Sequence, residues 1–245
     1  MNTLLDSVIT ALHLIWDLDS TLWSVVVRSV AVSATACLLA YALGVALGAW
    51  LAVARFAGRG VVLLILNTLL ALPSVVVGLL VYLLLSRTGP LGFLGWLFSF
   101  KAMVLAQVIL VVPVVTALTR QVVEDVEVLH GEQWASLGAG PCLRGWLLAW
   151  DERYALLTIG VAAFGRAISE VGAVMIVGGN IDGFTRVMTT AIALETSKGD
   201  LPLALGLGVV LLLVVLLLNL LAVGLRRWGQ RQHGPVVVAA KGWVA

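Results

Sequence analysis

Long apolar runs divide the chain into segments that are each long enough to cross a membrane. A transmembrane helix needs about 20 mostly apolar residues to span about 30 Å of hydrocarbon. Four of the runs carry no charged residue, and a fifth contains Arg166 and Glu170. The pattern therefore predicts five transmembrane helices. The predicted spans are residues 30–54, 61–85, 102–119, 154–177 and 201–225.

The composition agrees with a membrane protein and excludes an ordinary soluble domain. Of the 245 residues, 61% are hydrophobic and 11% are charged, whereas a soluble domain has roughly 25% charged residues. The mean hydropathy is +1.09. We expect an all-α integral membrane domain over residues 21–228. It follows a short amphipathic helix on the membrane surface within residues 1–20 and precedes a tail, residues 229–245. The net charge of +2 gives no support for nucleic-acid binding.

Basic residues between the predicted spans set the expected orientation. One side of the predicted membrane holds nine of them, and the other side holds five. The positive-inside rule assigns the richer side to the cytoplasm. Five spans then place the amino terminus outside and the carboxyl terminus in the cytoplasm of a multi-pass protein of the inner membrane. The nine are Arg55, Arg59, Arg120, Arg144, Arg153, Arg226, Arg227, Arg231 and Lys241, and the five are Arg28, Arg87, Lys101, Arg186 and Lys198.

Arg166 and Glu170 are the ionisable residues inside a predicted span. Residues four apart face each other on a helix, and a charge in the bilayer centre costs about 2.5–3.5 kcal/mol, so such residues face protein or a cavity. One interpretation is a self-neutralising pair that packs two helices together. The other is a pair beside a transport pathway that holds or releases a gate.

Two prolines interrupt predicted spans. Pro73 and Pro113 each remove a backbone donor and bend a helix. The bends either shape the helix bundle or expose carbonyl groups to a cavity. Ser74 near Pro73 and Ser169 near Glu170 can offer hydroxyl donors to an oxyanion, although small polar residues also join membrane helices. Pro73, Ser74, Arg166, Ser169 and Glu170 are therefore the candidate pathway and gate residues.

Strong turn-forming residues follow the fourth predicted span. Residues 178–183 read GGNIDG, a sequence typical of a tight turn. Residues 184–194 then fit a short re-entrant or interfacial helix. A plain turn outside the membrane is the simpler interpretation. Asn180, Thr185 and Arg186 are the candidates for a functional contact on this side.

The longest predicted cytoplasmic segment, residues 120–153, contains a recognisable pattern. Glu132 is followed by Gln133 and Trp134, and Gly138 stands six residues after the glutamate. The segment resembles the coupling motif of permeases of ATP-binding cassette (ABC) importers, which has alanines where this chain has Gln133 and Trp134. The resemblance implies a cytoplasmic coupling helix that docks onto an ATPase subunit. The implied coupling residues are Glu132, Gln133, Ala135, Ser136, Leu137, Gly138 and Ala139.

The resemblance extends over nearly the whole chain. Residues 68–92, 136–140 and 164–200 are similar to permeases of molybdate and tungstate importers, and the last stretch is most similar to the tungstate branch. This implies the type I importer fold and a homodimer in the lipid bilayer that moves tungstate by alternating access. It also implies two copies of an ABC ATPase, which bind ATP and Mg, and an extracytoplasmic oxyanion-binding protein. In that family, the side that holds Asn180, Thr185 and Arg186 forms the outer gate and meets the binding protein.

Other functions remain open from the sequence. Molybdate or sulfate is the alternative substrate within the same class. An ion-coupled carrier usually has repeated halves, and no internal repeat is visible here. A membrane scaffold that recruits a soluble protein is a further alternative. The chain contains no phosphate-binding loop of the form G-x-x-x-x-G-K followed by Ser or Thr, so we expect no cofactor and no catalytic activity in the chain itself.

Overall fold

The computed structural model describes residues 9, 16 and 20–233, and the regular elements in this range are all helices. The tail from residue 234 and almost all of the predicted amphipathic segment lie outside the described residues. The elements are α2 (Ser20–Val53), α3 (Arg59–Leu70), α4 (Ser74–Leu85), η1 (Gly92–Leu94), α5 (Phe100–Ser136), α6 (Pro141–Asp151), α7 (Arg153–Ile168), α8 (Gly172–Gly178), α9 (Met188–Lys198) and α10 (Leu201–His233).

The described helices give three to five candidate membrane spans. Helices α2, α5 and α10 are each long and apolar enough to cross a bilayer. Two further pairs, α3 with α4 and α7 with α8, pass the same test only when each pair is taken together. If each pair counts as one span, the total is five. The all-α membrane class predicted from the sequence is confirmed.

The second span breaks at Pro73, as its sequence predicted, whereas the prediction of the fourth span as a continuous helix is wrong. Helices α3 and α4 meet at an angle of 101°, and α7 and α8 meet at 57°. The first break contains Pro73, which has no backbone N–H and cannot continue a helix. The second break, residues 169–171, contains no proline. The 12 residues of α3 rise about 18 Å at about 1.5 Å per residue, which is less than the bilayer core.

Several other boundaries differ from the prediction. Helix α5 continues to Ser136, so much of the predicted loop 120–153 is a helical extension of the third span. The segment then turns at residues 137–140 and enters α6. The helix predicted over residues 184–194 instead covers Met188–Lys198, because residues 179–187 form an irregular loop. The first span begins at Ser20, ten residues before the predicted start.

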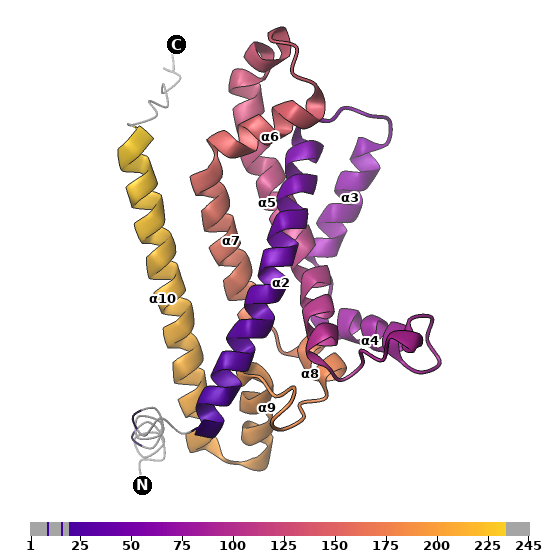
Figure 1. Ribbon diagram of the computed structural model, residues 1–245, viewed down its shortest axis with the longest axis vertical. Helices are drawn as coiled ribbons and strands as arrows, with labels where there is room; N and C mark the ends of the chain where they lie inside the picture. The colour runs from indigo at the N-terminus through magenta and orange to yellow at the C-terminus, as the bar shows by residue number, and fades with distance from the viewer. Residues whose placement is uncertain (1–8, 10–15, 17–19, 234–245) are drawn as a thin grey trace, which may run out of the picture.

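The helices form an elongated bundle with two distinct ends (Figure 1). Helix α2 starts at the lower end, which contains α9, and α10 finishes toward the upper end, at the level of α6. We call these the α9 end and the α6 end. The α6 end carries the turns at residues 54–58 and 137–140, and the α9 end carries the loop at residues 179–187. An odd number of crossings agrees with this arrangement.

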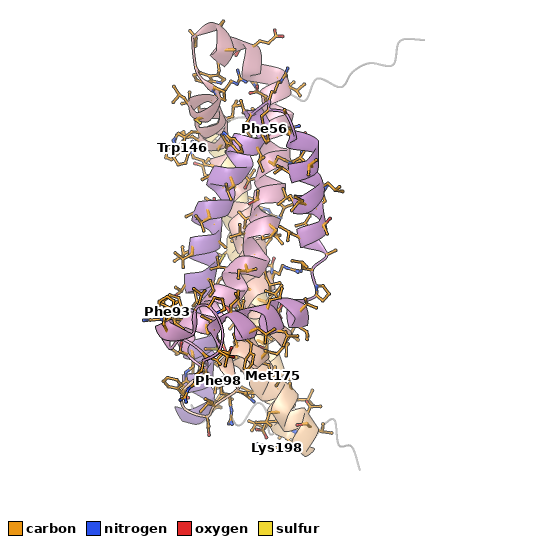
Figure 2. All side chains as sticks on the ribbon, turned by 90° about the vertical axis from the view of Figure 1, so that its right-hand side faces the viewer. Phe56, Phe93, Phe98, Trp146, Met175 and Lys198 are labelled. Atoms are coloured by element: carbon orange, nitrogen blue, oxygen red, sulfur yellow. The ribbon has the colours of Figure 1, made fainter. Side chains whose placement is uncertain are left out.

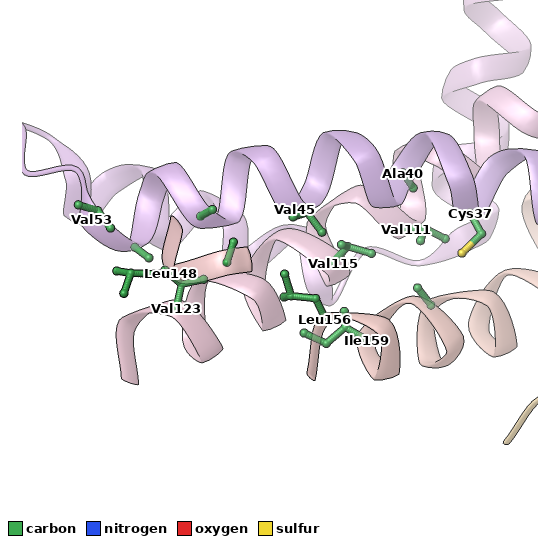
Figure 3. Packing of buried hydrophobic residues seen from close by; sticks show 14 of the residues in the cluster. Cys37, Ala40, Val45, Val53, Val111, Val115, Val123, Leu148, Leu156 and Ile159 are labelled. Atoms are coloured by element: carbon green, nitrogen blue, oxygen red, sulfur yellow. The ribbon is translucent and has the colours of Figure 1, made fainter. Parts of the chain in front are cut away.

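Small residues let the central helices approach closely. Helices α2, α5, α6 and α7 bury one continuous cluster of alanine, valine and leucine side chains toward the α6 end (Figure 3). A Cβ atom on Gly48 of α2 would lie 2.6 Å from the carbonyl oxygen of Thr116 on α5. Membrane helices associate largely through such close packing. Helix α5 therefore packs closely against α2 at the centre of the bundle.

A second buried cluster lies toward the α9 end. Helices α2, α4, α5 and α8 contribute to it, with Val81, Met103 and Val177 fully buried. A Cβ atom on Gly78 of α4 would lie 2.8 Å from the Cα atom of Ala173 on α8. Helices α4 and α8, which are the second helices of the two broken spans, therefore pack directly on each other.

Candidate functional site

The carboxyl end of α5 finishes in a defined cap at Gly138. The N–H of Ala139 donates to the carbonyl of Trp134 at 3.1 Å, and the N–H of Gly138 donates to that of Ala135 at 3.0 Å. These two bonds form a Schellman motif, in which the residue after the cap adopts the left-handed conformation. Gly138 has φ +80, and open space surrounds the position that a Cβ atom would take. The backbone conformation of the turn therefore favours the glycine of the predicted coupling pattern.

Most of the predicted coupling residues are exposed around this cap. Of the seven predicted coupling residues, six are exposed, among them Gly138, and Ala139 is half-buried. The side chain of Leu137 is 77% exposed. Trp134 instead packs against the first core cluster. We call residues 132–139 the tip. The five exposed residues are Glu132, Gln133, Ala135, Ser136 and Leu137.

Ion pairs join the part of α5 that precedes the tip to the neighbouring helices. Glu124 accepts from Arg59 at the start of α3 and from Arg120, the latter at 2.7 Å. Glu127 accepts from Arg144 of α6 at 3.0 Å, and both side chains are less than one-fifth exposed. Half-buried pairs of this kind restrict relative movement of the elements they join. The tip, α3 and α6 therefore form one connected unit.

Apolar side chains project at the same end. Val128, Leu129 and Leu143 are exposed near the tip, and Trp146 of α6 points away from the bundle (Figure 2). Gly145 allows α6 to cross α2 closely, since a Cβ atom there would lie 2.6 Å from the carbonyl oxygen of Ala49. The α6 end thus presents a firmly mounted, partly apolar surface that can receive a soluble partner.

The first break, residues 71–73, is held by its own backbone. The N–H groups of Ala71 and Leu72 donate to carbonyls in the last turn of α3, and the carbonyl of Pro73 accepts from Val76 and Val77. Within the described residues, no side chain forms a hydrogen bond to the backbone of residues 70–74. Pro73 is exposed, and Ser74 is half-buried as the first residue of α4.

The second break, residues 169–171, is held by side chains in addition to its own backbone bonds, in which the N–H of Glu170 donates to the carbonyl of Ala167 at 3.2 Å. The amide Nε2 of Gln107 on α5 donates to the carbonyl of Ala167 at 2.8 Å. The hydroxyl of Thr189 on α9 donates to the carbonyl of Glu170 at 2.8 Å. Glu170 Oε1 in turn accepts from the N–H of Ala173 at 3.2 Å. Backbone groups in a membrane must be satisfied internally, and here two other helices supply donors beside those of the segment itself.

The predicted face-to-face pairing of Arg166 and Glu170 is wrong in this conformation. Helix α7 ends at Ile168, so Glu170 lies beyond the helix and does not share its face. No ion pair joins the two side chains in the described part of the chain, although both line a hollow together with Gln107. Ser169 is exposed, and its hydroxyl donates to the carbonyl of Arg166 at 3.0 Å.

Both breaks lie side by side. A Cβ atom on Gly172, directly after the second break, would lie 2.8 Å from the hydroxyl oxygen of Ser74, directly after the first. The structure therefore brings the predicted pathway residues of the second and fourth spans into one region. Gln107 and Thr189 complete this region and were missed by the sequence reasoning. A lone glutamine in an uncharged span was the available signal for Gln107, because polar residues there usually have a partner.

The loop at the α9 end is tied to itself and to α2. The Thr185 hydroxyl donates to the carbonyl of Gly178 at 2.5 Å and accepts from the N–H of Ile181 at 3.0 Å. Thr185 is buried, so in this conformation it has no surface to offer a partner. Arg186 is half-buried and pairs with Asp182 at 3.1 Å. Asn180 has φ +49, as its place in the predicted turn requires.

Arg28 anchors this loop to the first span. Its guanidinium donates to the carbonyls of Gly183 at 2.8 Å and Arg186 at 3.2 Å. The Asn180 amide donates to the carbonyl of Thr190 at 3.3 Å. The exposed side chains of the loop are therefore Ile181, Asp182 and Phe184. Searched over the described residues, the chain shows no group of three or more His, Cys, Asp or Glu residues that could hold a metal ion.

These features define the class of protein. It is an all-α, multi-pass membrane protein with broken spans inside the bundle and an exposed tip at one end of it. No family model matches the chain. It is 40% identical over 209 residues to the tungstate uptake system permease TupB of Peptoclostridium acidaminophilum. The match covers 85% of this chain and 92% of the relative. It is 41% identical over 217 residues to a probable anion ABC transporter permease of Haloferax volcanii, covering 86% and 93%.

A more distant relative extends the group. The molybdenum transport system permease ModB of Escherichia coli is 32% identical over 192 residues, covering 73% of this chain and 82% of the relative. The chain belongs to the ABC transporter permease family that contains these anion uptake proteins.

Proposed function

We propose that this chain is the membrane-spanning subunit of an ABC importer that moves tungstate across the cytoplasmic membrane. The observation that carries the substrate is the 40% identity to a tungstate permease over nearly the full length of both chains, against 32% to a molybdenum permease. Molybdate remains the second candidate, because the two oxyanions have nearly the same size and charge. The chain itself hydrolyses no ATP.

The proposed assembly is a homodimer with two ATPase subunits and an extracytoplasmic binding protein. The exposed tip with its capped helix end supports docking of one ATPase subunit on each permease copy. ATP and Mg bind to the ATPase subunits. Basic residues support a cytoplasmic α6 end, because within the described residues eight belong to segments at that end and five to segments at the α9 end. The eight are Arg55, Arg59, Arg120, Arg144, Arg153, Arg226, Arg227 and Arg231, and the five are Arg28, Arg87, Lys101, Arg186 and Lys198. The loop carrying Ile181 and Phe184 would then meet the binding protein.

Alternating access would use the connections that the structure provides. Closure of the ATPase pair would push on the tip, and the ion pairs to α3 and α6 would move these helices with α5 as one unit. Helix α5 also contacts the second break through Gln107. The bend between α7 and α8 would change as the pathway opens toward the binding protein. ADP and phosphate release would return it, because each state is favoured by a different ligand.

The substrate is tested by uptake of tungstate into cells. Uptake is measured at low tungstate with excess molybdate or sulfate, with and without this chain, its ATPase and its binding protein. We expect uptake that needs all three components and that excess molybdate barely reduces. Equal competition by molybdate would leave a general oxyanion permease, and uptake without the ATPase would overturn the importer assignment.

Docking and coupling are tested by substitutions at the tip and at the second break. Glu132→Ala and Gly138→Asp should weaken co-purification of the ATPase, whereas Asp151→Ala, an exposed acid outside the tip, should leave it unchanged. Glu170→Gln keeps an acceptor for the N–H of Ala173 and should preserve assembly while lowering tungstate transported per ATP. Full ATPase retention in both tip variants would contradict the docking assignment.

A further inference from the structure

The amide side chain of Gln107 occupies an unusual position at the second break. It is 3% exposed and lies on α5, in the uncharged third span. Its Nε2 donates to the carbonyl of Ala167 in the last turn of α7. In an unbroken helix this carbonyl would accept from the N–H of Val171. In the bent span the carbonyl also accepts from the N–H of Glu170 at 3.2 Å. The glutamine therefore supplies, from a neighbouring helix, a second donor that stabilises the bent form of the fourth span.

The other half of the same amide has no partner within the described residues. Gln107 Oε1 is buried and accepts no hydrogen bond there. Buried polar groups are nearly always paired, and each exception calls for an explanation. Gln107 lines a hollow together with Arg166 and Glu170, and this hollow has no room for an oxyanion in this conformation. Arg166 is exposed and makes no side-chain hydrogen bond or ion pair in the described part of the chain.

We propose that Gln107 is a positioning residue for transport: it holds the second break bent in this state, and its free carbonyl oxygen accepts from Arg166 when the break moves. This inference rests on the proposed permease function and names the residue that links the break to the ATPase side. Both halves of the amide then have a use, one in each state. The unpaired oxygen disfavours the bent state alone and so keeps the second state accessible.

Helix α5 gives this residue a direct connection to the tip. Gln107 and Glu132 lie on the same unbroken helix, separated by about 38 Å at about 1.5 Å per residue. Close packing against α2 and the ion pairs near Glu124 prevent the helix from tilting independently. Movement of the tip therefore reaches the carbonyl of Ala167 through one rigid element.

The bend is measured by the distance between spin labels on the two sides of the break. Leu157 on α7 and Ile181 after α8 are both exposed and accept labels after substitution by cysteine, in a Cys142→Ser background because Cys142 is exposed. The full chain is placed in lipid nanodiscs, with the labelled chain diluted into unlabelled chain. The measurement is made with and without the ATPase and ATP.

Two variants separate the contributions of the two polar atoms of the amide. Gln107→Leu removes both groups and should move the nucleotide-free population three- to tenfold away from the bent state, the change expected for about one net hydrogen bond. Gln107→Glu removes the donor but keeps an acceptor for Arg166, so the shift should be larger. Thr116→Val removes another buried, unpaired hydroxyl from the described part of α5 and should change nothing.

Transport provides the second readout. In proteoliposomes with the ATPase and binding protein, Gln107→Leu should lower tungstate imported per ATP by a similar factor while complex assembly is retained. Unchanged distance distributions in both Gln107 variants would overturn the proposal, even if tungstate uptake is normal. Absence of tungstate uptake by the wild-type complex would instead reject the proposed function, and the distance measurement on the chain alone would still test Gln107.

Discussion

The two broken spans reach a similar result by different physical means. The first break bends by 101° and the second by 57°. Pro73 and turn hydrogen bonds within residues 68–77 maintain the first break, and its proline is exposed. The second break has no proline, and its own turn hydrogen bonds are supplemented by Gln107 from α5 and Thr189 from α9. One bend is therefore local in the sequence, and the other is imposed by tertiary contacts.

This difference separates a fixed bend from an adjustable one. The missing N–H of Pro73 is part of the covalent structure and disfavours a continuous helix there in every conformation of the protein. Hydrogen bonds from neighbouring helices exist only while those helices keep their positions. A movement of α5 or α9 therefore changes the second break directly and leaves the cause of the first one in place. We expect the second break to be the moving part and the first to be the surface against which it moves.

The largest expected effect is on the first bend, from Pro73→Ala. Removing the proline relieves a penalty of about 3 kcal/mol against a continuous helix, so α3 and α4 should straighten. Labels at the exposed residues Leu64 and Leu83 should then separate toward about 28 Å, the length of about 19 helical residues. Pro113→Ala is the matched control, since Pro113 lies inside a continuous α5. An unchanged distance would show that packing, and not proline, sets this bend.

The contact between the two broken spans gives the next effect. In Gly78→Ala the new Cβ would lie 2.8 Å from the Cα of Ala173, and overpacking of this kind costs about 2 kcal/mol. The melting temperature of the purified protein should fall. Gly165→Ala in α7 meets no described atom within 4 Å and should be neutral or stabilising, because alanine favours a helix more than glycine. Equal effects of both variants would contradict direct contact.

The sequence predicted local features well and distant contacts poorly. The three to five candidate spans followed from long apolar runs, and the bend at Pro73 followed from its missing N–H. The same reasoning placed Glu170 on a continuous helix with Arg166, because residues 165–175 contain no proline. The break depends on Gln107 and Thr189, which are distant in sequence. The 37-residue length of α5 was also missed, since charged residues concealed its continuation beyond the membrane.

A smaller effect is expected from Thr189→Val. Loss of the hydroxyl leaves the carbonyl of Glu170 without this donor and should lower the free energy of unfolding by about 1 kcal/mol. Thr158→Val is the control, because the Thr158 hydroxyl donates to the carbonyl of Tyr154 in its own helix and so joins no two elements. The melting temperatures of the two variants in the same detergent compare them. A loss in Thr158→Val as large as that in Thr189→Val would mean that the hydroxyl makes no special contribution at the break.

The smallest effect is the coupling between the two side chains that hold the second break. Gln107 and Thr189 bond to carbonyls three residues apart, from two different helices. If either bond alone keeps that segment bent, the double variant Gln107→Leu with Thr189→Val loses more stability than the two single losses combined, by about 0.5 kcal/mol or more. If each bond acts only on its own carbonyl, the losses add. The free energies of unfolding of the wild type, the two single variants and the double variant are compared in a double-mutant cycle. Additivity would reduce the second break to two independent contacts, whereas coupling would establish it as one cooperative element that α5 and α9 control jointly.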